Sequence, residues 1–264
     1  MTQTYQLVTA VEFLRPHNVF LINLDMSSYL LEYYTYRRDY AEVVTREQDE
    51  KLKDLIAAFA LHLSAIPSSD THAWTVSLVQ DPPYALFVTG TVGKLDQNGI
   101  THGSIVGNIL TDYIRHSDSN AIHAQVSAKG LVSNSYVNCE SQTISGMVET
   151  FCKQSEQREM RIHISEDSDT AIGIVALPDY DPEWFSQVDI KSLAKESINI
   201  DKVKMRECRF EFVCNCSAEK LLPFFNTLSE QELTDLYEDD QYLLITCPKC
   251  GKKFAIERED IKPN

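Results

Sequence analysis

Apolar residues follow two different spacings in the first 177 residues of the chain. In residues 46–66 they fall on one broad face, with the 3.6-residue period of an amphipathic helix. That face consists of Leu52, Leu55, Ile56, Phe59, Leu61, Leu63 and Ile66. Elsewhere, short runs rich in β-branched and aromatic residues, bounded by turn residues, predict strands. The predicted strands are 73–80, 84–95, 122–138 with a break at Lys129-Gly130, and a hairpin of 160–166 and 171–177.

Two further segments, 103–115 and 141–156, have the spacing of helices. Strands and helices therefore interleave as far as residue 177. The fold class that this order predicts is α+β (mixed α/β), with a core domain over residues 1–177.

The composition of the sequence changes at Pro178. Residues 178–207 contain two prolines and many charges, and they predict a linker with one or two marginal helices. The apolar anchors of this segment are Trp184, Phe185, Val188, Ile190 and Leu193. A small cysteine-rich module, predicted to bind zinc, follows over residues 208–264.

Charge and hydropathy narrow the class of protein. The net charge of −15 over 264 residues repels phosphate and argues against a nucleic-acid partner. No run approaches the roughly 18 apolar residues of a membrane helix, so we expect no membrane partner. Residues 1–7 lack the charged start and apolar core of a signal peptide, which predicts a cytoplasmic location.

The cysteines carry the most specific signal in the chain. There are seven, and in a reducing compartment they predict metal binding or thiol chemistry before structural disulfides. Cys247-Pro248-Lys249-Cys250 followed by Gly251 is a knuckle turn whose two thiolates converge on one ion. Cys214-Asn215-Cys216 follows an extended run, in which residues i and i+2 face the same side.

Four thiolates predict one Zn²⁺ per chain in the reduced form, held by Cys214, Cys216, Cys247 and Cys250. Such a site leaves no open position for water, so we expect no catalytic residues and no enzyme activity. The alternative is that these are buried structural cysteines that lie close together by coincidence. Cys208 is either a structural cysteine, an alternative ligand or a resolving thiol, and Cys139 and Cys152 are predicted to be small core residues.

The spacer between the two pairs predicts how they meet. Ser229-Glu230-Gln231-Glu232 is a capping box that opens a helix to about Tyr237, and residues 242–246 predict a strand. Pro223 should shorten a helix that begins after Ser217. Because so small a module depends on its metal, and adjacent thiolates can form disulfides, the pattern permits a switch from oxidation to unfolding.

These motifs resemble the redox-regulated heat-shock holdases known as thirty-three-kilodalton chaperonins. The resemblance is strongest from Phe210 to Phe254, as F-x-F-x-C-x-C-S, an acidic helix end at 237–240, and I-T-C-x-x-C-G-K-K-F. Gln154-Ser155-Glu156-Gln157 before the strand at 160–166 is a second match, and the order of core, linker and zinc module is a third. The first 120 residues match poorly.

The resemblance implies a function, which is an ATP-independent holdase that is inactive while reduced and zinc-bound. Peroxide or hypochlorous acid would then pair Cys214 with Cys216 and Cys247 with Cys250, so that zinc is lost and module and linker unfold. Exposed groups, among them Trp184, Phe185 and Leu193, would bind unfolding client proteins, and the active form would be a homodimer. Two alternatives remain, a zinc-ribbon binding or regulatory protein in which the zinc is purely structural, and a thiol enzyme with an activated cysteine.

Overall fold

A long, mostly antiparallel sheet curves around one buried helix. The computed structural model describes residues 5–40, 43–66, 70–111, 114, 116–196, 201–238 and 240–261. Within these residues the large sheet has ten strands in the order β7-β6-β3-β4-β5-β10-β1-β2-β9-β8. All described neighbours in it are antiparallel except β10 and β5, which are parallel.

The strands of the large sheet are β1 Gln6–Leu14, β2 Val19–Asp25, β3 Thr71–Ser77, β4 Ala85–Leu95, β5 Ile100–Leu110, β6 Asn120–Ala128, β7 Leu131–Cys139, β8 Met160–Ile164, β9 Thr170–Ala176 and β10 Lys202–Glu211. A separate two-stranded sheet contains β11 Tyr242–Thr246 and β12 Lys253–Glu257. The α-helices are α1 Ser27–Tyr40, α2 Arg46–Ala65, α3 Ile144–Gln154, α4 Pro182–Gln187, α5 Ile190–Glu196, α6 Leu222–Phe225 and α7 Glu230–Tyr237. Short 3₁₀ turns cover Ala218–Lys220 and Arg258–Asp260. The predicted mixed α/β fold class is confirmed.

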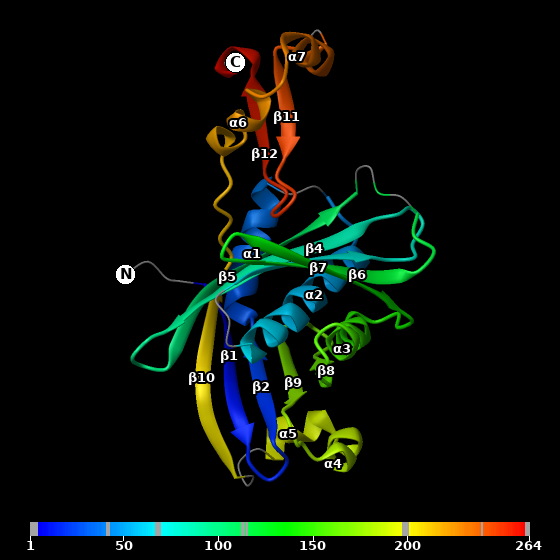
Figure 1. Cartoon of the computed structure of the whole chain (residues 1–264), viewed down its shortest axis with the longest axis vertical. Coiled ribbons are helices and arrows are strands. Elements are labelled where there is room, and N and C mark those ends of the chain that lie inside the picture. Colours follow the sequence, from blue (N-terminus) through cyan, green and yellow to red (C-terminus); the bar gives the residue numbers. More distant parts are fainter. Residues whose placement is uncertain are drawn as a thin grey trace.

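Helix α2 is the centre of the core. Thr45 caps it through a capping box with Gln48. Figure 1 shows β4, β6 and β7 running across the view and β1, β2 and β10 running along its length, with α2 passing diagonally through the region where they meet. Strands of both of these sets pack on α2. The helix is therefore buried on nearly all sides from Leu52 to Ala65, rather than on the single face that its pattern predicts.

The predicted helix at 103–115 is wrong, since residues 100–110 form strand β5 and residues 112, 113 and 115 lie outside the described part of the chain. Ile105, Val106 and Ile109 fit a helical face as well as a buried strand. Gly107 decides in favour of the strand, because a Cβ there would lie 3.0 Å from Leu52 Cδ1 and 3.1 Å from the Phe87 carbonyl oxygen. The backbone of β5 therefore approaches α2 more closely than a side chain would allow.

The segment after Pro178 contains two short helices, as predicted. Asp181 caps α4 by accepting a hydrogen bond from the Trp184 amide. Both helices pack on strands β1, β2 and β9 through a cluster separate from the main core. Helices of this length are not stable in isolation, so this packing is what holds them.

Strand β10 lies across the predicted boundary between linker and module. It pairs with β1 along its whole length, and Glu207–Glu211 also pair with β5. Residues 202–211 are thus part of the large sheet, and the part of the predicted cysteine module that lies outside this sheet begins after Glu211. The division into core, linker and module stays a prediction. Its boundary between residues 207 and 208 falls inside β10, which is a strand of the large sheet.

Two buried histidines make the stability of the core pH-dependent. His62 and His72 have rings 5.9 Å apart, and His62 Nε2 and both His72 ring nitrogens have no hydrogen-bond partner among the described residues. Burial lowers the pKa of each, with His72 and Arg158 also acting on His62, while Asp70 opposes the shift at His72. The folded state therefore keeps both rings neutral.

We expect acid to destabilise this core. The unfolded chain takes up protons near the ordinary histidine pKa of about 6.5, whereas folded His62 does not, so stability is lost as the pH falls below about 6.5. His62 alone should lower the free energy of unfolding by about 1.4 kcal/mol between pH 7.5 and 5.5. Urea unfolding at the two pH values measures this. His62→Leu should reduce the pH dependence, and the exposed His102→Gln should not; an equal dependence in all three proteins would contradict this reading.

None of the helices in the described residues combines the length and the apolar character needed to cross a membrane.

Candidate metal centre

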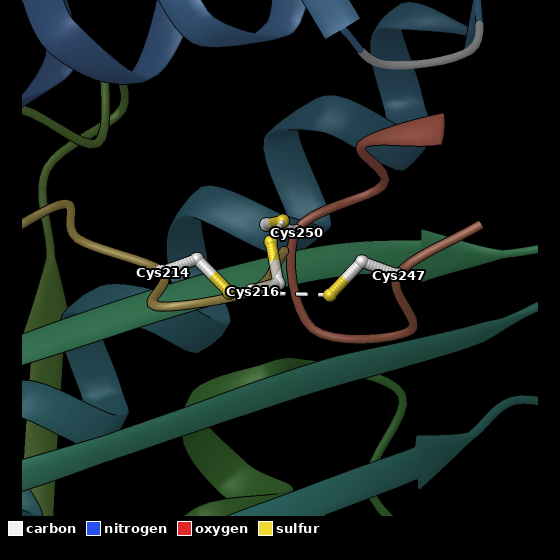
Figure 2. Close-up of side chains that lie close together, drawn as sticks. All are labelled: Cys214, Cys216, Cys247 and Cys250. Carbon is white, nitrogen blue, oxygen red and sulfur yellow. Dashed lines mark hydrogen bonds between the residues drawn. The ribbon is translucent and has the colours of Figure 1, made fainter. Parts of the chain in front are cut away.

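Two segments far apart in the sequence bring four cysteines together. Cys214 and Cys216 follow β10, and Cys247 and Cys250 lie in the turn between β11 and β12. Figure 2 shows the four side chains directed toward one another from these two segments. Sγ of Cys214 lies 3.9 Å from Sγ of Cys247, and Sγ of Cys216 lies 3.5 Å from Sγ of Cys250. All four sulfurs lie within 4.8 Å of one another.

The turn that carries Cys247 and Cys250 is built by the backbone. The Gly251 amide donates to the Cys247 carbonyl at 2.8 Å, and the Cys247 amide donates to the Lys252 carbonyl at 2.8 Å. Gly251 has φ +80°, a conformation that favours glycine. A Cβ there would also lie 2.9 Å from Oδ1 of Asn108 in β5. Glycine is therefore required both by the turn and by the contact between turn and core.

The module has a small apolar core of its own. Its buried members are Phe225, Leu233, Tyr237, Ile256 and Ile261. The predicted capping box at Ser229 and Glu232 is present, and α6 is a single short turn at Pro223, as expected. So few buried side chains cannot offset the entropy of ordering the module, which therefore needs another source of stability.

The sulfur geometry and chemistry fit one metal ion. Four ligands about 2.3 Å from a tetrahedral ion lie about 3.8 Å from one another, which matches the separations seen here. Thiolates are soft donors that select ions such as zinc over calcium or magnesium. Hydrogen bonds from Cys214 and Cys250 lower the pKa of Cys247, whereas burial raises the pKa of Cys216 to about 11. The four cysteines are thus positioned to hold a metal ion.

The cluster borders an open cavity of about 630 Å³. Cys214, Cys216 and Cys247 line it on the module side, and strands β3, β4 and β5 line it on the core side. Cys247 and Cys250 are buried, whereas Cys214 and Cys216 are only half-buried. A small solute therefore has a path to the cluster, chiefly to its first pair.

The other three cysteines lie in the core. Cys139, Cys152 and Cys208 are all buried, and Cys208 is within β10, between β1 and β5. Burial raises the pKa of Cys152 to about 12 and also raises that of Cys139, which keeps these thiols protonated and unreactive. In the described residues, the metal-ligand cluster contains none of the three.

Helix α1 contributes a contact that the sequence interpretation missed. The Tyr36 hydroxyl donates a hydrogen bond of 2.9 Å to Sγ of Cys250. The ring of Tyr36 lies 4.9 Å from that of Phe212, which follows β10. One turn on, the ring of Tyr40 has Lys252 Nζ 4.8 Å from its centre. The sequence does contain a signal for this face, because Tyr29, Tyr33, Tyr36 and Tyr40 recur at helical spacing.

The residues predicted to bind clients are covered in this structure. Phe185 and Leu193 are 3% and 2% exposed, and Trp184 is partly buried against the same cluster. The Trp184 ring stacks on His17 at 3.8 Å between ring centres. Arg161 in β8 donates hydrogen bonds to the carbonyls of Phe185 and Val188, which ties α4 to the sheet. Their role in client binding stays a prediction.

A wrapped α/β core followed by a four-cysteine metal module is the class of protein that this fold and site define. The family model described as Hsp33 protein matches residues 123–257, just over half of the chain. The chain belongs to the Hsp33 family.

Relatives named 33 kDa chaperonin are similar over parts of the chain. That of Pectobacterium atrosepticum is 26% identical over 150 residues, covering 48% of this chain and 52% of its own length. That of Prochlorococcus marinus is 23% identical over 196 residues, covering 66% of this chain and 59% of its own length. That of Alkaliphilus oremlandii is 35% identical over 51 residues, covering 19% of this chain and 17% of its own length. The matches thus span less than two thirds of each of these relatives.

The fold extends the similarity to the whole chain. The crystal structure of the 33 kDa chaperonin from Thermotoga maritima, a heat shock protein 33 homolog, superposes with a TM-score of 0.69. The match covers 97% of this chain and 96% of that one, at 11% sequence identity. The N-terminal part, which matches poorly in sequence, therefore retains the fold.

Proposed function

We propose that this chain is an ATP-independent holdase that oxidation of its four-cysteine centre activates. The observation that carries the proposal is the convergence of Cys214, Cys216, Cys247 and Cys250 in a module with little apolar core of its own. Family membership supports the chaperone activity, since the relatives carry the name chaperonin. Unfolding proteins are the proposed partners.

The proposed cofactor is one Zn²⁺ per reduced chain. Four thiolates satisfy its tetrahedral preference, and bound zinc supplies the folding free energy that the small apolar core lacks. With no position left for water, the centre has a structural and redox role rather than a hydrolytic one. Lys252, close to the cluster, reduces the excess negative charge of four thiolates around one divalent ion.

Oxidation converts ligands into disulfides. In each reaction two thiolates give up two electrons and form one S–S bond, while one hypochlorous acid and one proton become chloride and water. We propose the pairs Cys214–Cys216 and Cys247–Cys250. Neighbours within each pair are close in sequence, and the cavity beside Cys214 and Cys216 gives an oxidant access to the first. Cysteines in disulfides no longer bind the ion as thiolates, so the module loses its main source of stability.

The resemblance implies that the folded module holds the linker, but the two lie far apart. Figure 1 shows α4 and α5 at one end of the molecule and the module, with α7, β11 and β12, at the other. Strand β10 connects them, since it follows α5 and ends three residues before Cys214. We therefore propose that unfolding of the module loosens the Glu211 end of β10. The disturbance passes along this strand to the helices that precede it, so that α4 and α5 come off the sheet and expose Trp184, Phe185 and Leu193.

A client-aggregation assay tests the proposal. A heat-unfolding client is followed by light scattering with the protein reduced and supplied with Zn²⁺, and again after hypochlorous acid treatment, with zinc release read by a chromogenic chelator. We expect only the oxidised, metal-depleted protein to suppress scattering. Zinc retained through oxidation, or released without suppression, would instead support a purely structural zinc. Size measurement of the same oxidised sample tests whether it is a homodimer.

A further inference from the structure

The tyrosine face of α1 attaches to three different partners through its hydroxyl groups. Tyr29 donates to the Ile105 carbonyl in β5 at 2.9 Å, and Tyr33 donates to Oδ1 of Asp49 in α2 at 2.6 Å. Tyr36, on the same face, donates instead to Sγ of Cys250 at 2.9 Å. The first two hydroxyls fix the helix on the core, so the third is held in place as a contact from the core to the cysteine cluster.

The rings reinforce this placement. Those of Tyr29, Tyr33 and Tyr36 surround Phe212, with ring centres at 5.8, 6.0 and 4.9 Å. Phe212 is 6% exposed and lies two residues before Cys214. Tyr36 therefore touches both segments of the cluster, Cys250 through its hydroxyl and the segment leading to Cys214 through its ring.

A hydrogen bond changes what a cysteine sulfur can do. A phenol that donates to a thiolate withdraws charge from the sulfur, which lowers its nucleophilicity toward an oxidant; contacts of this kind tune metal-bound ligands. A disulfide sulfur carries no charge and is a much weaker acceptor. The Tyr36 contact is thus strong in the reduced form and weak after oxidation of Cys250.

We propose that Tyr36 is a positioning residue that slows oxidation of Cys250 and couples the redox state of the cluster to docking of the module on the core. This inference rests on the proposed redox function. When Cys250 and a second cysteine of the cluster pass two electrons to hydrogen peroxide, its O–O bond breaks and, with two protons, two waters form. The Tyr36 hydroxyl then loses its charged acceptor.

The other described features of the interface between α1 and the module are weaker than that bond. Lys252 over the Tyr40 ring is a partly exposed contact, and a cavity of about 500 Å³ separates β11 from β5 and Arg37. Exposed cation–π contacts are weak. Oxidation of Cys250 should therefore loosen the module from α1, although the turn also contacts Asn108 in β5 at Gly251.

The test is Tyr36→Phe, which removes the hydroxyl and keeps the ring against Phe212. Tyr40→Phe is the matched control, because it removes a hydroxyl from the same helix and keeps the ring under Lys252. Both are loaded with Co²⁺ and their sulfur-to-cobalt charge-transfer band is recorded. Peroxide-driven thiol loss is then timed in the Zn²⁺ forms, and thermal unfolding of the core is recorded.

We expect Tyr36→Phe to shift the charge-transfer band and to speed thiol oxidation about tenfold, as loss of one hydrogen bond to a charged group predicts. Tyr40→Phe should leave the band unmoved and the rate within about twofold of the unchanged protein. An unshifted band or an unchanged oxidation rate in Tyr36→Phe would overturn the proposal. The charge-transfer band and the oxidation rate are both measured without a client protein. A chain that fails to act as a holdase could therefore still confirm or contradict the role of Tyr36.

Discussion

Replacement of Cys247 by serine will abolish metal binding and unfold the module, while the large sheet stays folded. A neutral hydroxyl does not replace a thiolate, and structural zinc contributes about 10–16 kcal/mol to the folding of small domains. The apolar cluster of the module is too small to offset that loss. Metal content per chain and limited proteolysis across residues 212–261 measure the outcome.

Cys139→Ala is the control for this variant. Cys139 is buried in β7 and lies outside the described metal-ligand cluster, so its loss should leave metal content at one ion per chain. A Cys247→Ser protein that still holds a full equivalent of metal would show that the cluster is not the metal centre. Equal loss of metal in both variants would point to damage to the fold.

Truncation of the buried linker anchor, as Phe185→Ala, should make the reduced protein suppress client aggregation without oxidant. Phe185 is 3% exposed at the centre of the cluster between α4, α5 and the sheet. Truncation of a buried phenylalanine to alanine costs about 3–5 kcal/mol of packing free energy. Two helices this short are not stable by themselves, so they cannot make up for that loss and should come off the sheet. Light scattering of the client and metal content are measured together, since we expect the metal to be retained.

Ser186→Ala is the matched control on the same helix. Ser186 is exposed and its hydroxyl donates to the Glu183 carbonyl within the same helix, so the linker should remain docked and the reduced protein inactive. A Phe185→Ala protein that stays inactive while its linker exchanges amide hydrogens freely would contradict the proposed client-binding role of the remaining linker groups, Trp184 and Leu193, since Phe185 itself is truncated in this variant.

The sequence could predict segments whose signal is local. The capping box at Ser229, the break at Lys129-Gly130 and the short turn at Pro223 depend on a few neighbouring residues, and the structure contains all of them. The four cysteines could be predicted as one site because metal chemistry constrains residue type and spacing so tightly.

The rest depends on contacts between distant parts of the chain. Residues 202–211 have charged and apolar residues that suit a linker, and only their pairing with β1 and β5 makes them a central strand. The 103–115 segment fits a helix until α2 packs against Gly107. The spacing of the tyrosines predicts a face of α1, but the partner of Tyr36 is 214 positions away.

Hydrogen exchange on one protein sample before and after oxidation tests most directly the claim that oxidation at the cysteines is transmitted to the linker. We expect amides in 212–261 and in α4 and α5 to lose protection together, β10 to be loosened at its Glu211 end, and α2 to remain protected. Loss of protection confined to 212–261, with α4 and α5 as protected as in the reduced protein, would contradict it.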